Sequence, residues 1–219
     1  PLNWRLVARE LAYIVNDCQP KVLIGGRDFM GVLNELRPGR QVRPPAAAGQ
    51  VNVEHYVSVE GAPIEGALSY EAGLAQAPDT ELPRPALDDE DPYCILYTSG
   101  TTGRPKGALI PHRQILWNAI NTVVSWGLNE GDVSPVFTPL FHAGGLFAFL
   151  TPLFYIGGRI VLARTFDVEE SLRTIVQERC TVVLGVPTLY QMWQNSPYFS
   201  QADFRHVRFF ISGGAHCPV

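Results

Sequence analysis

The stretch YTSGTTGRPKGA, residues 97–108, contains four Ser/Thr hydroxyls, three glycines and one lysine. A β-rich run leads into it at Tyr97, and apolar residues resume at Leu109 and Ile110. Glycines let the backbone approach a ligand closely and adopt positive φ, so successive N–H groups can converge on an anion. The hydroxyls add short donors, and Lys106 adds a positive charge. The stretch therefore predicts a loop that binds a polyphosphate.

The residues around Lys106 differ from the Walker P-loop, G-x-x-x-x-G-K-[ST], in which the Ser/Thr binds magnesium. Pro105 precedes the lysine and lacks a backbone N–H, and Gly107 follows it in place of a hydroxyl residue. One alternative is a Ser/Thr/Gly-rich turn without a ligand, because these residues are common turn formers. The length of the run favours the phosphate-binding interpretation.

Beyond Pro92, β-rich runs alternate with helical patterns. The β-rich runs span residues 93–97, 133–137, 159–162, 181–184 and 207–211, and the helical patterns span 115–124, 168–177 and 188–193. Such alternation is typical of βαβ units. We therefore expect an α/β fold with mainly parallel sheets covered by helices.

The N-terminal part has a simpler pattern. Apolar residues recur at helical spacing from Leu6 to Val15, Pro20 ends the predicted helix, and the strand-like run KVLIGG follows at 21–26. A Pro/Gly/Ala-rich connector at 37–50 and a polar, acidic loop at 79–92 come next. We expect residues 1–90 to form an N-terminal α/β piece and residues 91–219 to form an α/β piece that carries the phosphate loop.

Composition excludes several classes of protein. The net charge is −4, which gives no basic surface for nucleic acid. Cysteines 18, 94, 180 and 217 have no metal-ligand spacing, which favours reduced thiols in a cytoplasmic protein over disulfides. The apolar stretch from Leu140 to Ile156 is too short to span a membrane, so we expect a buried core helix there.

Four motifs together resemble one family. YTSGTTGRPKGA is similar to the signature of the AMP-forming synthetase superfamily, which includes acyl-CoA synthetases and the adenylation domains of peptide synthetases. PLFHAGG at 139–145, VVLGVPTLYQMW at 182–193 and FISGGAHCPV at 210–219 resemble later motifs of that family. The resemblance extends over nearly the whole chain.

The resemblance implies a reaction between a carboxylic acid and Mg·ATP that gives an acyl-adenylate and pyrophosphate, followed by transfer of the acyl group to coenzyme A. It implies β/γ-phosphate binding by Thr98, Ser99, Gly100, Thr101, Thr102, Gly103 and Lys106. It places the adenylate pocket at Gly213, Gly214 and Ala215, and the acyl and carboxylate site at His142, Gly185 and Val186. No metal ligand is expected in this chain, beyond Thr98 or Thr101 near the Mg²⁺-bound phosphates.

Each of these assignments has a structural alternative. His142 could be a histidine that only caps a helix start, and Gly213 to Ala215 could be an ordinary turn after a strand. Core packing explains Gly185 and Val186 equally well, and we expect the aromatic residues 147, 149, 154 and 155 to lie in the core. His216 and Cys217 depart from the family pattern and lack the partners of a metal site.

The neighbourhood of His142 indicates the substrate class. Amino-acid-activating members of the family place an aspartate near this motif, whereas no Asp or Glu occurs from Val133 to Leu162. An unpaired buried ammonium would be costly. We therefore expect a fatty or aromatic acid that ends as a CoA thioester.

The motifs expected after SGGA, and the family's small C-terminal domain with its catalytic lysine, do not occur in these 219 residues. We therefore expect part of the large N-terminal domain, inactive in complete adenylation by itself and prone to form homo-oligomers through exposed edges. The alternative is a non-catalytic nucleotide-binding or interaction module derived from the same fold.

Overall fold

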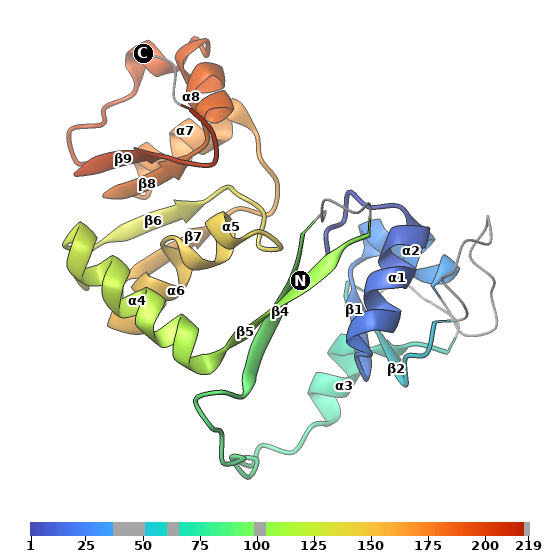
Figure 1. The fold of residues 1–219 in the computed structure, drawn as a ribbon. Helices are drawn as coiled ribbons and strands as arrows, with labels where there is room; N and C mark the ends of the chain where they lie inside the picture. The colour runs from blue at the N-terminus through green and yellow to red at the C-terminus, as the bar shows by residue number, and fades with distance from the viewer. Residues whose placement is uncertain (37–50, 61–65, 99–103, 217–219) are drawn as a thin grey trace. The chain divides into compact units, whose positions relative to one another are not determined.

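The computed structural model describes residues 1–36, 51–60, 66–98 and 104–216 (Figure 1). The chain divides into two compact units. The first comprises Pro1–Leu87 with Tyr97–Ala108, and the second comprises Asp88–Leu96 with Leu109–Val219. The domain boundary that we predicted between residues 90 and 91 stays a prediction.

The first unit is built around a three-stranded parallel sheet with the order β1-β2-β3. Its elements are α1 (Ala8–Cys18), β1 (Val22–Gly25), η1 (Arg27–Phe29), α2 (Met30–Glu35), β2 (His55–Ser58), β3 (Leu68–Ser69) and α3 (Tyr70–Gln76). Leu11 and Val15 of α1 are buried in one cluster with Leu23 of β1. The helix ends where Gln19 adopts a left-handed conformation with φ 46°, directly before Pro20. The predicted helix and strand are therefore both present.

Strands β4 (Pro92–Thr98) and β5 (Lys106–Pro111) pair in a two-stranded sheet. The connection between them is shorter than the dozen or more residues that a parallel crossover needs. The two strands are therefore antiparallel, and they flank residues 99–103, which lie outside the described residues.

The second unit contains the alternating strands and helices that the sequence predicts. After β5 come α4 (His112–Trp126), β6 (Val133–Val136), α5 (Ala143–Phe147), α6 (Leu150–Ile156), β7 (Arg159–Leu162), α7 (Val168–Gln177), β8 (Val182–Gly185), α8 (Pro187–Gln194), η2 (Phe199–Gln201) and β9 (Phe209–Ser212). The pairs β6–β7 and β8–β9 are parallel. The N–H of Thr181 donates to the carbonyl of Val133 at 2.8 Å, which places β8 beside β6. The strands thus lie in the order β7, β6, β8, β9 (Figure 1).

Both faces of this layer are covered, as expected for parallel strands. Val182 of β8 is fully buried with Phe149 and Leu153, in a cluster on the side of α6. Its neighbour Val183 is buried on the opposite face, with Leu172 of α7 and Trp193 of α8. The period-2 alternation of β8 therefore joins two helical layers. The predicted α/β fold with helix-covered parallel strands is confirmed.

The stretch from Leu140 to Ile156 differs from the single buried helix that we predicted. It forms two short helices, and Phe154 and Tyr155 are 79% and 55% exposed, whereas Phe149 is 4% exposed. Pro152 explains the break, because in one continuous helix its missing N–H would leave the carbonyl of Ala148 without its partner. Phe154 and Tyr155 are exposed because a short helix that packs on a sheet buries only one stripe of its surface. The predicted core position is wrong for Phe154 and Tyr155.

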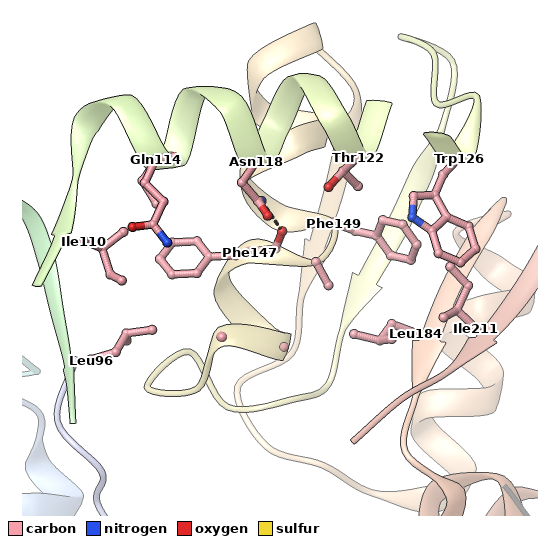
Figure 2. Close-up of a pocket in the computed structure, with 14 residues that line it drawn as sticks. Leu96, Ile110, Gln114, Asn118, Thr122, Trp126, Phe147, Phe149, Leu184 and Ile211 are labelled. Atoms are coloured by element: carbon pink, nitrogen blue, oxygen red, sulfur yellow. Dashed lines mark hydrogen bonds between the residues drawn. The ribbon is translucent and has the colours of Figure 1, made fainter. Parts of the chain in front are cut away.

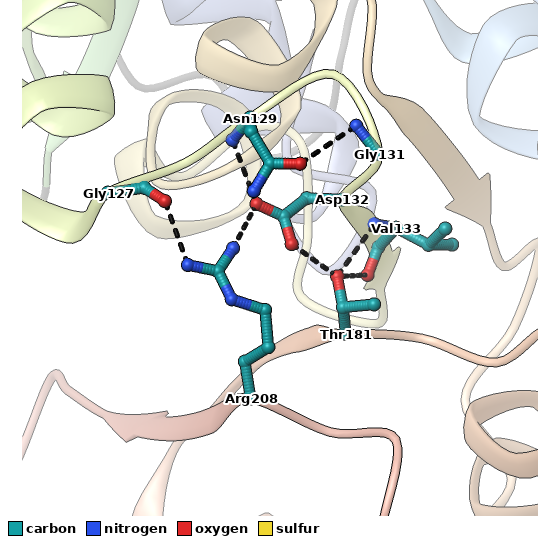
Figure 3. Close-up of polar contacts among 7 residues, drawn as sticks. All are labelled: Gly127, Asn129, Gly131, Asp132, Val133, Thr181 and Arg208. Carbon is teal, nitrogen blue, oxygen red and sulfur yellow. Dashed lines mark hydrogen bonds and ion pairs between the residues drawn. The ribbon is translucent and has the colours of Figure 1, made fainter.

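A charged network lies where three of these strands begin (Figure 3). Asp132, directly before β6, is 1% exposed and accepts hydrogen bonds from the N–H of Asn129 at 2.9 Å and the hydroxyl of Thr181 at 2.6 Å. It also pairs with Arg208, whose second nitrogen donates to the carbonyl of Gly127 at 2.8 Å. Burial alone would raise the pKa of Asp132, but the bonds from Arg208, Thr181 and Asn129 outweigh burial and hold it below its usual value. The network ties the amino ends of β6, β8 and β9 together.

Within the described residues, no helix combines the length and the apolar character that a membrane span requires. Cys18, Cys94 and Cys180 are free thiols, whereas Cys217 lies outside the described residues. Burial raises the pKa of Cys180 to about 12, which makes its thiolate inaccessible near neutral pH.

Candidate functional site

The carboxyl ends of β8 and β9 meet in a turn rich in small residues. β8 ends at Gly185 and β9 at Ser212, and the N–H of Gly213 donates to the carbonyl of Gly185 at 3.2 Å. Gly214 has a φ of +84°, and a Cβ on it would lie 3.6 Å from Cγ1 of Val186. The structure thus brings together four of the residues predicted for the adenylate and acyl pockets, with Ala215 next in the chain. Open α/β sheets bind ligands at this edge.

Gly185 has a packing reason of its own to be glycine. A Cβ at this position would lie 2.9 Å from the ring of Tyr190 and 3.3 Å from that of Trp193. The Tyr190 hydroxyl in turn donates to the carbonyl of Ile211 at 2.6 Å. This arrangement agrees with the core-packing alternative for Gly185, and its effect on the site is to hold the ends of β8 and β9 against α8.

His142 occupies the N-cap of α5. Its Nδ1 accepts a hydrogen bond from the N–H of Gly144 at 3.1 Å, which places the proton of a neutral ring on Nε2. The side chain is exposed, and Nε2 has no partner among the residues that the structure describes. The helix-start alternative therefore describes one ring nitrogen only. The other, Nε2, belongs to an exposed side chain.

Gly145 sets the shape of the turn that follows β6. A Cβ on it would lie 2.3 Å from the carbonyl oxygen of Pro139 and 2.6 Å from that of Thr138. Both obstacles are backbone atoms, so any side chain would displace the turn that presents His142. Steric constraints therefore explain why the last residue of PLFHAGG, Gly145, is a glycine.

The phosphate-loop residues belong to the first unit. Thr98 is the last residue of β4 and Lys106 is the first of β5, so the two flank the loop. Both are exposed, and the Lys106 ammonium has no ion-pair or hydrogen-bond partner in the described part of the chain. The predicted phosphate ligands Ser99, Gly100, Thr101, Thr102 and Gly103 lie outside the described residues.

Tyr97 anchors the start of this loop within the first unit. Its hydroxyl donates to Oδ2 of Asp17, at the end of α1, at 2.5 Å. Burial first, and then the hydrogen bond to Asp17, raise the pKa of Tyr97 well above its usual range. The phenol therefore stays protonated and acts as a donor that holds Tyr97 to the end of α1.

A pocket of about 480 Å³ lies within the second unit (Figure 2). Leu184 of β8 and Ile211 of β9 form part of its wall, directly before the turn residues described above. Ala143 and Gly144, which follow His142, contribute another part. The full lining is Leu96, Ile110, Gln114, Ile115, Asn118, Thr122, Trp126, Ala143, Gly144, Phe147, Ala148, Phe149, Leu184 and Ile211. Its size and mainly apolar lining are those of a small-molecule site.

Sequence reasoning missed the contribution of α4 to this pocket. Gln114, Asn118, Thr122 and Trp126 line it at intervals of four residues, which places them on one face of the helix. That spacing is visible in the sequence, but polar residues at every fourth position are also typical of a solvated helix face. Phe147, predicted as a core aromatic, lines the pocket.

Comparison with known proteins agrees with these features. The family model for AMP-binding enzymes matches residues 1–219. A feruloyl-CoA synthase from Amycolatopsis is 34% identical over all of this chain and 39% of its own length. An indoleacetate–CoA ligase from Aromatoleum aromaticum is also 34% identical, over 100% of this chain and 40% of its own. The chain spans about two fifths of the length of these curated relatives.

Solved structures show the same fold. The anthranilate CoA ligase AuaEII in complex with anthranoyl-AMP aligns with a TM-score of 0.85 and 28% identity, over 99% of this chain and 40% of its own. The N-terminal domain of FACL13 from Mycobacterium tuberculosis aligns with a TM-score of 0.80 and 27% identity, over 100% and 50%. Because the family model matches the whole chain, the chain belongs to the AMP-binding enzyme family.

Proposed function

We propose that this member of the AMP-binding enzyme family supplies the phosphate-binding loop and the acyl pocket of an ATP-dependent acyl-CoA ligase. The observation that carries the proposal is the junction, within one unit, of the Gly185–Gly213 turn and an apolar pocket of about 480 Å³ that begins at Leu184 and Ile211. Relatives named as CoA synthases and ligases support the reaction class.

The reaction joins two anions, so catalysis depends on positioning and on neutralising charge. Lys106 and Thr98 are exposed donors that suit the β- and γ-phosphates of ATP, together with the hydroxyls and glycines at 99–103. Mg²⁺ bound to ATP would supply further positive charge at the phosphates. Thr98 or Thr101 would be the residue of this chain nearest that ion.

His142 is proposed to orient the substrate carboxylate. A carboxylic acid is already ionised near neutral pH, so no general base is needed. The Nε2–H of His142 can donate to one carboxylate oxygen while the other attacks the α-phosphorus of ATP and pyrophosphate leaves. In the second step the sulfur of coenzyme A attacks the acyl carbon, and AMP leaves. Gly213, Gly214 and Ala215 are the proposed wall for the adenylate.

The substrate class follows from the pocket and the relatives together. Trp126, Phe147 and Phe149 supply aromatic surface to the pocket. Two relatives at 34% identity and one solved structure are named for feruloyl, indoleacetate and anthranilate, which are aromatic, whereas relatives named for fatty acids are 27–29% identical. We therefore favour an aromatic acid over a long alkyl acid.

Titration calorimetry of the full chain tests the proposal. It uses ATP and a non-hydrolysable acyl-adenylate, 5′-O-(N-cinnamoylsulfamoyl)adenosine. A ligase site binds both and prefers the adenylate, which fills the acyl and nucleotide positions together. If the chain binds neither compound, the proposed function is wrong, and the chain is an interaction module.

Lys106→Met sharpens this test. We expect about 10- to 100-fold weaker ATP binding, because a charge-assisted hydrogen bond is lost, and a much smaller effect on the adenylate, which lacks β- and γ-phosphates. Lys21→Met removes the other exposed lysine of the described first unit and serves as the matched control. Equal losses for both compounds would contradict the phosphate role of Lys106.

A further inference from the structure

The mainly apolar pocket also has polar side chains along one wall. Gln114, Asn118 and Thr122 reach into it from successive turns of α4, whereas the facing wall contains Phe147, Leu184 and other apolar residues (Figure 2). The three polar side chains form a strip along one side of the pocket. We call it the polar strip.

The polar strip has unused hydrogen-bonding capacity. The amide nitrogen of Asn118 donates to the carbonyl of Phe147 at 2.9 Å, which leaves Oδ1 as an acceptor without a partner among the described residues. Within the same described part, the Gln114 amide and the Thr122 hydroxyl have no partner at all. The bond to Phe147 also fixes the orientation of the Asn118 amide, so the acceptor is held in place.

These unpaired groups determine which acid fits. An acid with a purely alkyl or unsubstituted aromatic body would remove water from the polar strip without replacing its hydrogen bonds, which is unfavourable. A hydroxyl on an aromatic body can donate to Oδ1 of Asn118 and accept from Gln114 or Thr122, while the ring lies against Phe147 and Phe149.

Resting on the proposed function of the same pocket, we infer that the polar strip selects aromatic acids that carry a hydroxyl substituent. Ala143 and Gly144 place the pocket next to His142, so the carboxylate end of the acid is set there. The ring then extends along α4, and its substituent lies against Gln114, Asn118 and Thr122. Gln114 and Thr122 are specificity-determining residues, and Asn118 combines that role with a structural one.

The test compares two acyl-adenylate analogues that differ in one hydroxyl, 4-hydroxycinnamoyl and cinnamoyl sulfamoyl adenosine, by calorimetry on the full chain. We expect the hydroxylated analogue to bind about tenfold tighter, since one additional hydrogen bond is made. The isosteric changes Thr122→Val and Gln114→Met, singly and together, should reduce this ratio towards one. Affinity for the cinnamoyl analogue should rise in these variants, because the unsubstituted ring no longer has to displace water from the polar groups.

Gln191→Met is the matched control, because it makes the same change on an exposed face of α8, away from the pocket. Circular dichroism melting shows whether each variant is folded. Equal binding of the two analogues by the wild-type chain would overturn the inference and leave the proposed function intact. Failure of both analogues to bind would overturn the proposed function and this inference with it. A ratio that survives the double change would also overturn the role of the polar strip.

Discussion

The two ends of the strands in the second unit differ in composition, with charged and polar side chains at the amino end and glycines at the carboxyl end. At the amino end, Asp132, Thr181 and Arg208 precede β6, β8 and β9 and form a buried, charge-assisted network. At the carboxyl end, glycines follow or end the same three strands: Gly145 lies in α5 after β6, Gly185 is the last residue of β8, and Gly213 directly follows β9. The first end uses side-chain hydrogen bonds to fix the strands, whereas at the second end close packing leaves no room for a Cβ on Gly145 or Gly185.

This difference separates stability from binding. The Asp132 carboxylate of the amino-end network is buried, and both of its oxygens accept hydrogen bonds within the protein. At the carboxyl end, the Nε2 of His142 and the polar strip of α4 have hydrogen-bonding capacity to spare within the described structure. Changes at the amino end should therefore alter the free energy of unfolding, whereas changes at the carboxyl end should alter affinity.

The largest effect should come from Asp132→Ala. Removing the carboxylate leaves Arg208 and the Thr181 hydroxyl without their shared partner, and breaking a buried ion pair typically costs about 3–5 kcal/mol. Arg208 is partly exposed, so we expect the lower part of that range. Urea denaturation monitored by tryptophan fluorescence measures the loss. A change below about 1 kcal/mol would show that the network does not hold the strands.

A smaller effect on stability, with a loss of binding, is expected for Gly145→Ala. The new Cβ would clash with the carbonyls of Pro139 and Thr138, and such overpacking typically costs about 1–3 kcal/mol. The turn would shift and move His142, so affinity for the adenylate analogue should fall as well. Gly31→Ala, where a Cβ meets nothing within 4 Å, is the matched control. Retained affinity in Gly145→Ala would break the proposed division between the two ends.

The smallest effect should be a pH dependence between about pH 5 and pH 2. The pKa of Asp132 is lowered in the folded protein, so its stabilisation is complete above the unfolded value of about 4 and is lost as pH falls through the lower, folded value. Stability should thus decline slightly towards pH 4 and more steeply below it. Urea midpoints of wild type and Asp132→Asn across this range isolate the contribution, because the variant lacks this titration. Parallel curves for the two proteins would contradict it.

Sequence patterns predicted best those elements for which local sequence preferences alone specify the structure. The predicted ranges Arg159–Leu162 and Val168–Gln177 coincide with β7 and α7, since β-branched residues, the N-cap Asp167 and a helical apolar period all agree there. The break between α5 and α6 was missed, although Pro152 signals it, because the apolar content of the segment favoured one long helix.

Features that join distant residues could not be predicted in the same way. The pairing of Asp132 with Arg208 spans 76 positions, and neither residue has a local pattern that identifies its partner. The pocket is similar, because its walls come from α4, α5, β8 and β9 and exist only after these elements pack. Motif resemblance predicted His142 and Gly213 as site residues, but it carried no information about α4, whose side chains line the pocket.

The pairing of Asp132 with Arg208 also has a consequence for how the chain is made. During synthesis, β6, β7 and β8 leave the ribosome before Arg208 does. These three strands can therefore pair before the Asp132 carboxylate has its cationic partner. Native closure of this unit is therefore a late event of synthesis, set by a non-local contact. Until that contact forms, only hydrophobic packing and backbone hydrogen bonds such as those between β6 and β7 can hold the nascent strands, and Arg208 then adds the ion pair with Asp132.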